Sequence, residues 1–485
     1  LNRGIDTLEK ADQFLNVKLK NLYDPFLLTN MDKAIERILL AFKRNELIYG
    51  FGDYDVDGLT SLSILYLFID EIHHNIKYLV PNRQSSGYGL NKDAIYQMYI
   101  NKASLIITVD CGISNFDEIE YANSLGIDVI VIDHHQVPEN LPPAVAVLNP
   151  YLIGDKFPFP HMAAVGVTFN MLVALRKTLR ERGFFNGKEE IDLKKYLDIV
   201  SIGTIADIVP LFDENRIFTK IGFEQMLHTS HAGLRALMNE SEVTAPIDSV
   251  KIGFKIAPRI NAAGRMSDAT KVVDLLTTKD PVIAQKIAKD LNDENIKRQE
   301  IEHKIFLEIV SLIENKKTKN TAIILAHETW HPGVIGIVAT KIVERYNRPT
   351  FLFSISDGIG RGSARSINGF DLYLNLSEIK DLFINYGGHK YAAGLSINMN
   401  NYKTFKSKIQ TASNKFFEDP ENLVHELLVD DILEAKDISI QLFNEMQLFA
   451  PYGHKNPEPI FGLKNLFPID AKIIAERHLK LHITA

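Results

Sequence analysis

The chain has 485 residues, enough for about three domains that each bury a core. Hydrophobic residues make up 46% and charged residues 24%, a balance that excludes a disordered, fibrous or collagen-like protein. The single cysteine excludes an internal disulfide and a cysteine-based zinc site. No apolar run approaches the ~20 residues that cross a bilayer. The formal charge of −7 gives no sign of nucleic-acid binding. We therefore expect a cytoplasmic protein with no membrane segment.

Short apolar runs rich in β-branched residues recur in the first half of the chain, separated by stretches long enough for a helix. This alternation is typical of βαβ units and a parallel sheet, with strands predicted at 47–52, 104–109, 128–132 and 145–148. Three of these strands are followed by an acid, namely Asp53, Asp110 and Asp133. Ligands of open α/β sheets bind beyond the carboxyl ends of the strands, so a functional site is expected there.

The second half of the chain begins with one predicted long helix over 281–314. Asp280 suits the N-cap, Pro281 suits the first turn, and isoleucines recur mostly at four-residue spacing. Such a helix would span ~50 Å, which favours a strut between domains. Strands predicted at 321–326 and 350–355, with a helix at 334–346, indicate a second α/β lobe. A helix around 438–449 and strands near 459–462 and 479–483 follow.

Three carboxylates alternate directly after the first strand: Asp53, Asp55 and Asp57. In an extended chain all three face the same side, and their repulsion is costly unless a divalent cation neutralises it. A helix-loop-helix calcium site is an alternative, but a strand precedes the motif and Ile64 occupies the position of the required glutamate. Solvated turn acids are the other alternative.

Further metal-ligating residues follow later strands and helices. Asp110 is either a ligand or the N-cap of the next helix. Of His134 and His135, one can bind metal while the other acts as an acid or holds a phosphate oxygen. Asp207 is a charge in an apolar stretch and needs a partner such as a metal. This oxygen-rich set favours two manganese or magnesium ions and in-line attack on phosphorus: Asp53, Asp55, Asp57, Asp110, His134 and Asp207.

These four motifs, in this order, resemble the metal motifs of the DHH phosphoesterase family, and a first motif beginning with Asp is similar to its RecJ branch. The resemblance extends through Pro81–Arg83, Pro258–Arg265, His331–Ala339 and Gly387–His389. It implies a processive, single-strand-specific DNA exonuclease that starts from a 5′ end, needs Mn²⁺ or Mg²⁺, and serves DNA repair and recombination. Asp110 is expected to bridge both ions, and His135 to lie near the scissile phosphate.

The resemblance also implies an α/β fold of two lobes joined by the long helix. The expected parts are a helical lead-in over 1–45, a DHH phosphoesterase domain over 46–270, the connecting helix over 271–318, a DHH-associated domain over 319–420, and the start of a truncated oligonucleotide-binding (OB) barrel over 421–485. The second lobe is expected to close over the first and form a channel for single-stranded DNA.

The motif 360–366 has the composition of a phosphate grip. Small residues let a phosphate approach backbone N–H groups, and two arginines can bind it bidentately, although a glycine-rich hairpin turn is the alternative. With the family positions, the predicted DNA contacts are Arg83, Arg259, Asn261, Arg265, Arg361, Ser363, Arg365, Gly387, Gly388 and His389.

Single-stranded DNA is the expected partner of a monomeric enzyme, with a single-strand-binding protein and a helicase as further candidates. Two other functions are open. One is a phosphodiesterase of the same superfamily that acts on cyclic dinucleotides or very short oligonucleotides, but such relatives generally lack the strut and the barrel. The other is a replication-associated binding module that lost its metals, which the presence of all six predicted ligands disfavours.

Overall fold

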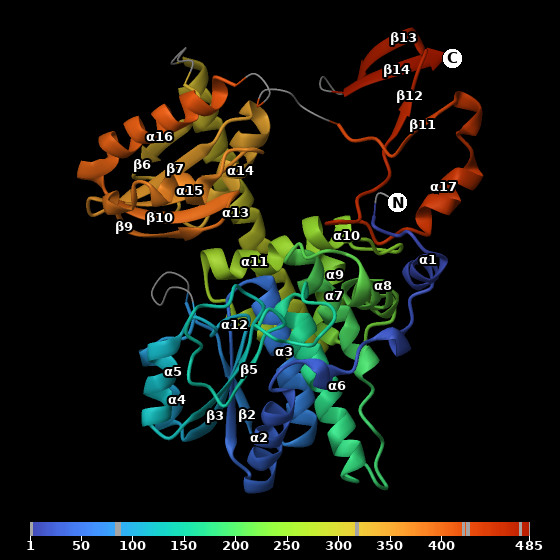
Figure 1. Ribbon diagram of the computed structural model, residues 1–485, viewed down its shortest axis with the longest axis vertical. Helices are drawn as coiled ribbons and strands as arrows, with labels where there is room; N and C mark the ends of the chain where they lie inside the picture. The colour runs from blue at the N-terminus through green and yellow to red at the C-terminus, as the bar shows by residue number, and fades with distance from the viewer. Residues whose placement is uncertain are drawn as a thin grey trace. The chain divides into compact units, whose positions relative to one another are not determined.

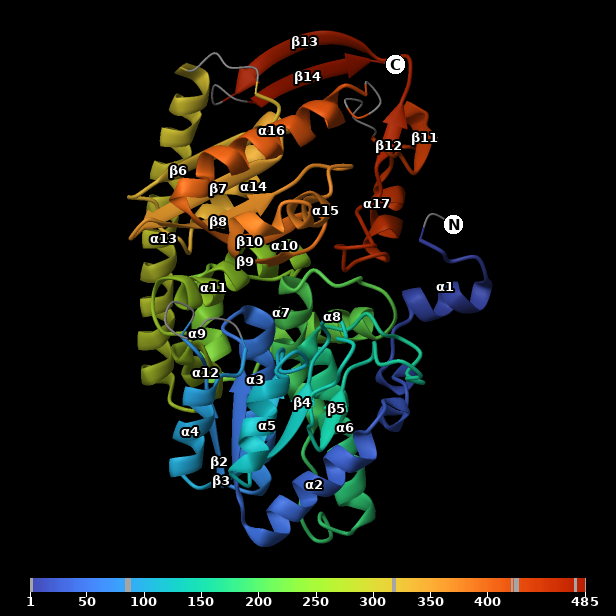
Figure 2. The same cartoon turned by 60° about the vertical axis from the view of Figure 1, so that its left-hand side comes forward.

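The computed structural model describes residues 3–82, 89–315, 320–419, 422, 427–474 and 478–484. Contacts divide the chain into two compact units, shown in Figures 1 and 2. The first unit combines Leu1–Asn292 with Leu428–Ala485, and the second is Asp293–Leu427. Within the described ranges, no helix has the length and apolar character needed to span a membrane.

A parallel five-stranded sheet organises the first unit. Its order is β2-β1-β3-β4-β5, and the strands are β1 (Leu47–Gly52), β2 (Ile76–Leu79), β3 (Ala103–Val109), β4 (Asp128–Ile132) and β5 (Ala146–Leu148). The four predicted strands are confirmed. The edge strand β2 was not predicted, because it is short and its Lys77 faces solvent.

Helices cover both faces of this sheet (Figure 1). Alternate residues of β4 point to opposite sides: Ile130 and Ile132 enter one apolar cluster, and Val129 and Val131 enter the other. The second cluster is closed by α4 (Lys92–Ile100) and α5 (Phe116–Ser124).

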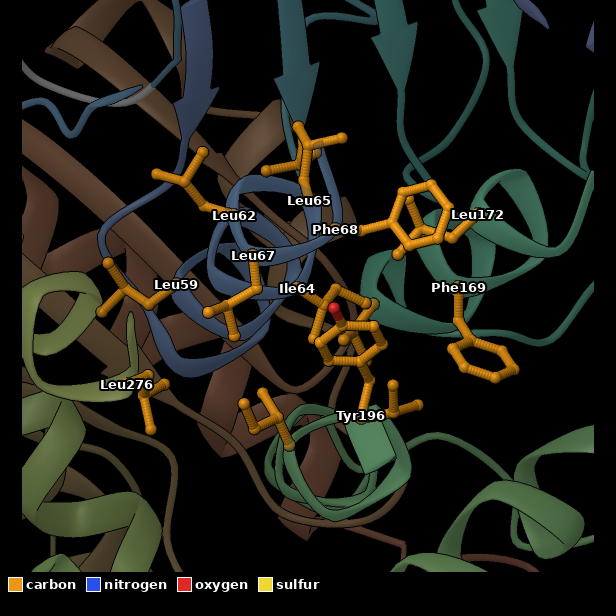
Figure 3. Packing of buried hydrophobic residues seen from close by; sticks show 14 of the residues in the cluster. Leu59, Leu62, Ile64, Leu65, Leu67, Phe68, Phe169, Leu172, Tyr196 and Leu276 are labelled. Atoms are coloured by element: carbon orange, nitrogen blue, oxygen red, sulfur yellow. The ribbon is translucent and has the colours of Figure 1, made fainter. Parts of the chain in front are cut away.

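The larger cluster is built around α3 (Val56–Ile72), which is buried on nearly all sides. Figure 3 shows Leu65 and Phe68 of this helix beside Phe169 and Leu172 of α6 (Ala164–Glu181), with Tyr196 below them. A helix that is apolar all round belongs in a core. Because α3 and α6 begin at the carboxyl edge of the sheet and α7 (Leu197–Ala206) ends there, this core fixes the polar residues at their ends.

The other helical segments of the first unit surround these layers. They are α1 (Leu8–Leu15), α2 (Met31–Arg44), α8 (Asp213–Met226), α9 (Ala232–Glu240), α10 (Ser249–Lys251), a π-helical turn (Ile252–Ile256), α11 (Ala257–Met266), α12 (Thr270–Thr277) and the 3-10 turns Leu19–Asn21, Pro25–Leu27 and Leu193–Tyr196.

The C-terminal part of the first unit has the start of a barrel but not a closed one within the described residues. β11 (Asp431–Leu433) pairs with β12 (Phe461–Leu463), α17 (Ile440–Gln447) lies between them in sequence, and β13 (Phe467–Ile474) forms a hairpin with β14 (His478–Thr484). The predicted helix and two strands are confirmed. Strand β13 was missed because Pro468 and Asp470 interrupt its apolar pattern.

Arg216 of α8 joins this C-terminal part to the rest of the first unit. Its side chain is 1% exposed and donates hydrogen bonds to the carbonyl oxygens of Phe14, Leu448, Phe449 and Ala450. The guanidinium also lies 3.8 Å from the centre of the Phe14 ring. One buried cation therefore joins segments near the two ends of the chain.

The long helix α13 (Pro281–Asn315) is confirmed, and the Asp280 carboxylate accepts hydrogen bonds from the N–H groups of Val282 and Ile283, as an N-cap does.

The second unit has a mixed sheet of order β6-β7-β8-β10-β9. Its elements are β6 (Ile323–His327), α14 (Ile335–Tyr346), β7 (Thr350–Ser356), β8 (Ile359–Arg365), α15 (Leu372–Ser377), β9 (Phe383–Gly388), β10 (Ala392–Asn398) and α16 (Tyr402–Phe417), with the 3-10 turns Lys380–Leu382 and Met399–Asn401. A further 3-10 turn, Ala435–Asp437, belongs to the first unit.

Candidate metal centre

The three acids of the first motif do not lie on an extended segment, so that expectation was wrong. Asp55 is the N-cap of α3, and its carboxylate accepts hydrogen bonds from the N–H groups of Asp57 and Gly58 at 3.0 and 3.1 Å. The chain therefore turns into the helix at Val56, and Asp57 sits in the first helical turn. Gly58 is required because a Cβ atom there would lie 2.6 Å from the Asp53 carbonyl oxygen.

Asp57 is buried against the start of another helix. Its two carboxylate oxygens accept hydrogen bonds from the backbone N–H groups of Ala164 and Val165, at 2.6 and 2.9 Å, at the beginning of α6. The positive end of a helix dipole stabilises an anion in this position. The helix thus compensates part of the charge that the site concentrates.

Asp110 follows β3 in a left-handed backbone conformation, with a φ of 59°. Aspartate tolerates this conformation better than most residues. The next helix, α5, begins at Phe116 with Asn115 as its N-cap, so the alternative that Asp110 caps this helix is excluded. The turn instead points the Asp110 side chain into the acid cluster.

The two histidines have different surroundings. Nε2 of His134 is buried without a hydrogen-bond partner among the described residues, and it lies 3.2 Å from an Asp110 oxygen and 3.7 Å from an Asp57 oxygen. His135 is half exposed, and its Nδ1 lies 2.7 Å from Asp133. Asp133 also accepts the N–H groups of both histidines, so it orients this loop, a role that the sequence reasoning missed.

The structure gathers all six predicted ligands into neighbouring groups. Asp53, Asp55 and Asp110 form one, and Asp57, His134 and Asp207 form another, with the ligand atoms of each within 4.8 Å of one another. A third group, Asp110 with His134 and His135, connects the two. Five carboxylates and one imidazole suit two Mn²⁺ or Mg²⁺ ions, and Asp110 belongs to the first and the third of these groups. The assignment of each residue as a ligand stays a prediction.

Burial and crowding shift the protonation of these groups. Burial, together with the charge of nearby acids, raises the pKa of Asp57 to about 7 and of Asp207 to about 9, and raises the pKa of Asp110 well above its ordinary value. Burial lowers the pKa of His134 to about 4, so its neutral ring can bind a metal. Burial opposes the charge on His135, but Asp133 outweighs it and raises the pKa to about 9.

These shifts predict how Mn²⁺ stabilises the protein at different pH values. The raised pKa values of Asp57 and Asp207 stabilise the metal-free fold at low pH, and that contribution is lost as the pH rises through about 7 and about 9. A divalent cation can neutralise the ionised carboxylates of Asp57 and Asp207 in place of the lost protons. We expect the melting temperature to rise more with saturating MnCl₂ at pH about 9 than at pH about 6. Scanning fluorimetry with and without the metal measures this, and an equal gain at both pH values would contradict it.

The predicted DNA contacts of the first unit have different surroundings and stay predictions. Arg83 lies outside the described residues. Arg259 of α11 donates hydrogen bonds to Asn292 and to the Lys255 carbonyl oxygen, so its guanidinium is used within the fold. Asn261 and Arg265 are half buried on the same helix.

Gly264 brings helix α11 against the first metal motif. A Cβ atom at this position would lie 2.6 Å from the carbonyl oxygen of Tyr54, between two of the acids. Arg265 follows directly in the chain. The sequence analysis singled out this segment only through the family resemblance and predicted no helix there.

The motif at 360–366 is a strand and not a phosphate-binding loop. β8 pairs with β7 on one side and β10 on the other, which engages its backbone N–H groups, so the expected contact of these groups with phosphate was wrong. The hairpin turn is formed by Asp357 and Gly358 instead, both with positive φ. What β8 can offer a ligand is its side chains. These are Arg361, Ser363 and Arg365, which alternate along one face of the strand.

Two exposed glycines continue this surface across the sheet. Ser363 pairs with Gly394 of β10, which in turn pairs with Gly387 of β9. A Cβ atom at Gly387 or Gly394 would meet nothing within 4 Å, so packing does not require glycine at either position. Gly388 differs: its φ is 146° and a Cβ would lie 2.4 Å from the Ala392 carbonyl oxygen. His389 follows, exposed. Gly394 was not among the predicted contacts.

The parallel sheet, the acids at its carboxyl edge and the attached mixed-sheet unit define a metal-dependent phosphoesterase of the DHH type. The model of the DHH family N-terminal domain matches residues 47–204, that of the DHHA1 domain matches 318–415, and that of the RecJ OB domain matches 429–485. The last match confirms the expected OB segment.

The chain belongs to the RecJ family. It is 36% identical to the single-stranded-DNA-specific exonuclease RecJ of Bacillus subtilis over 100% of this chain and 60% of that protein. It is 35% identical to the Escherichia coli RecJ over 99% of this chain and 85% of that protein. The structure resembles the crystal structure of Thermus thermophilus RecJ in complex with Mn²⁺, with a TM-score of 0.84 and 31% identity over 99% of this chain and 69% of the other. It also resembles the complex of that protein with Mg²⁺, with a TM-score of 0.78 and 29% identity over 99% of this chain and 67% of the other.

Proposed function

We propose that this protein is an exonuclease specific for single-stranded DNA, which hydrolyses phosphodiester bonds with two Mn²⁺ or Mg²⁺ ions. The observation that carries the proposal is the convergence of five carboxylates and one buried imidazole at the carboxyl edge of the sheet. The proposal is supported by the exonucleases of which this chain covers the larger part.

The chain's own residues have distinct roles in this reaction. The groups Asp53, Asp55, Asp110 and Asp57, His134, Asp207 are the residues that would hold the ions. Bound divalent ions supply Lewis acidity and lower the pKa of water. His135 is kept protonated by Asp133 up to a pH of about 9, so it can donate a hydrogen bond to an oxygen of the scissile phosphate. Asp133 is a positioning residue.

A grip on the DNA backbone comes from the second unit. Arg361, Ser363 and Arg365 line one face of β8, where Arg365 also donates hydrogen bonds to Ser363 and to the Ala364 carbonyl oxygen, and the exposed glycines beside them leave room for a phosphate. These contacts carry no base information, which suits an enzyme that degrades any sequence.

The direction of digestion is tested with one single strand labelled at either end. We expect an enzyme that starts at the 5′ end to release the 5′ label at once as a mononucleotide, whereas the 3′ label remains on a strand that shortens gradually. Both reactions require Mn²⁺ and stop with a chelator. A blunt duplex and a circular single strand are the controls. Cutting of the circle would show an endonuclease, and early loss of the 3′ label would reverse the direction.

The other two functions are less well supported. An enzyme for cyclic dinucleotides needs no OB segment, yet residues 429–485 match one. A module that lost its metals would not retain all six ligands in contact range. The roles in repair and recombination, the single-strand-binding protein and helicase partners, the monomeric state and the cytoplasmic location stay predictions, as do the domain boundaries.

A further inference from the structure

Four aromatic side chains gather beside the metal centre and have no part in the chemistry described above. Tyr151, His161 and Phe212 are exposed, by 43% for Tyr151 and 37% for Phe212, and the rings of His161 and Phe212 contact that of Phe159, which is only 3% exposed. We call Tyr151, His161 and Phe212 the aromatic shelf. The sequence reasoning gave these residues no role.

The rings of the shelf meet at steep angles. The Phe159 ring lies 5.8 Å from His161 and 5.4 Å from Phe212, at 83° and 68°, and the Tyr151 and His161 rings are 6.0 Å apart at 58°. None of these pairs is stacked face to face. When two aromatic rings meet at a steep angle, one ring contacts the other with its edge, and a face of the exposed ring stays available for another flat group.

A hydrogen bond fixes the pair at the front of the shelf. The Tyr151 hydroxyl lies 2.9 Å from Nδ1 of His161. Burial, together with the charge of Asp207, raises the pKa of Tyr151, so its hydroxyl keeps its proton. The effect of Asp207 also shows that Tyr151 lies within its electrostatic reach.

Two buried asparagines bind the shelf to the loops that carry the site. Asn149 donates a hydrogen bond to the His135 carbonyl oxygen at 2.9 Å and accepts the Tyr151 N–H at 2.9 Å. Asn215 donates to the carbonyl oxygens of His161 and Pro210, and Pro210 lies three residues after Asp207. Both asparagines are fully buried. Each end of the shelf is therefore held to a segment of the metal centre.

The segment that begins with His161 is itself part of the metal centre. Ala164 and Val165 donate their N–H groups to Asp57, and the backbone of Met162 forms a hydrogen bond with His134. His161 is thus the residue next to a direct neighbour of the buried imidazole. The shelf therefore adjoins the segment whose backbone N–H groups hold Asp57.

We infer that the aromatic shelf binds a nucleobase of the substrate strand next to the scissile phosphate, by stacking on Tyr151 and His161. This inference rests on the proposed function and deepens it, because stacking positions the strand without reading its sequence. Every base has a π-face, so purines and pyrimidines are both accepted. Tyr151 and His161 are positioning residues under this inference.

Binding is tested first, in an Asp110→Asn background that does not degrade the DNA. Single strands carry 2-aminopurine at one of the first four positions from the 5′ end, and its fluorescence falls when the base stacks. We expect one position to be quenched by the protein with an intact shelf, and the quenching to be lost with Tyr151→Ala or His161→Ala. Tyr151→Phe, which keeps the ring, should retain it.

Activity supplies the second readout, in the protein with Asp110. On a normal strand Tyr151→Ala should lower kcat/KM about tenfold, mainly through KM. On a strand that is abasic at the quenched position, Tyr151→Ala should change nothing. The matched control is Phe184→Ala, an exposed aromatic residue just beyond the far end of α6, about 27 Å along the helix from Ala164.

The two readouts separate failure of the inference from failure of the proposed function. If the unsubstituted protein digests single strands but Tyr151→Ala behaves like Phe184→Ala in both assays, the shelf does not bind a base. If quenching at all four positions persists in Tyr151→Ala and His161→Ala, the same conclusion follows. Absence of nuclease activity from the unsubstituted protein would overturn the proposed function and this inference together.

Discussion

Asp110→Asn is expected to lower the rate of single-strand hydrolysis about thousandfold. Asp110 is the acid shared by the neighbouring groups of predicted ligands, and losing its charge removes several kcal/mol of stabilisation from the site. Asparagine is the right replacement because the residue has a φ of 59°, which asparagine tolerates and alanine does not. Digestion of an end-labelled strand at saturating MnCl₂ measures the rate.

The same variant should be more stable than the original protein when metal is absent. Burial and the neighbouring acids raise the pKa of Asp110, so its carboxylate destabilises the fold as the pH rises above the ordinary value. At pH about 8 with a chelator, we expect a higher melting temperature for Asp110→Asn and unchanged binding of the single strand. A lower melting temperature would show that the residue is needed for folding, and retention of a tenth of the rate would show that it is not a shared ligand.

Gly387→Val is expected to lower the turnover of single strands about a hundredfold while leaving the second unit folded. A side chain at this position meets nothing within 4 Å, and valine favours a strand more than glycine does. The added methyl groups would hold a DNA phosphate away from Ser363 and Arg365, and a displacement of about 1 Å can cost this much in rate. Steady-state kinetics on a long strand, with thermal melting alongside, measure both effects.

A size series provides the control for this experiment. Gly387→Ala should have a smaller effect than Gly387→Val, and Gly394→Val, on the neighbouring strand, should resemble Gly387→Val. The series contradicts the proposed grip if turnover does not depend on side-chain size. A fall in melting temperature in step with turnover would instead mean that the glycines serve the fold.

Much of the fold could be predicted because its signals are local. The four predicted strands are mostly apolar runs, as expected of strands covered on both faces, and α13 begins with the N-cap Asp280 and with Pro281 in its first turn. The convergence of the acids was also predictable, since the carboxyl ends of neighbouring parallel strands share one edge.

The parts that could not be predicted depend on contacts between distant segments. The Asp55 side chain caps α3, so the helix begins at Val56. This turns the Asp57 carboxylate towards α6 and away from Asp53 and Asp55. Asp133 was visible only as one more acid after a strand, yet in the fold it orients both histidines. Asn149 and Asn215 carried no signal, because an asparagine in a loop has the same local appearance whether it is solvated or joins two loops.

The arginine that joins both ends of the chain has a consequence for synthesis on the ribosome. Phe14 is made early, but the acceptor at Ala450 is 234 residues beyond Arg216, so at ordinary elongation rates it emerges about 10 to 50 s later. The Leu211 N–H, one residue before the aromatic shelf, waits even longer for the His454 carbonyl oxygen. The contacts of Arg216 and Leu211 are thus completed long after these two residues have been synthesised. A nascent chain can therefore carry every predicted ligand and still lack these two contacts until residues 450 to 454 have left the exit tunnel.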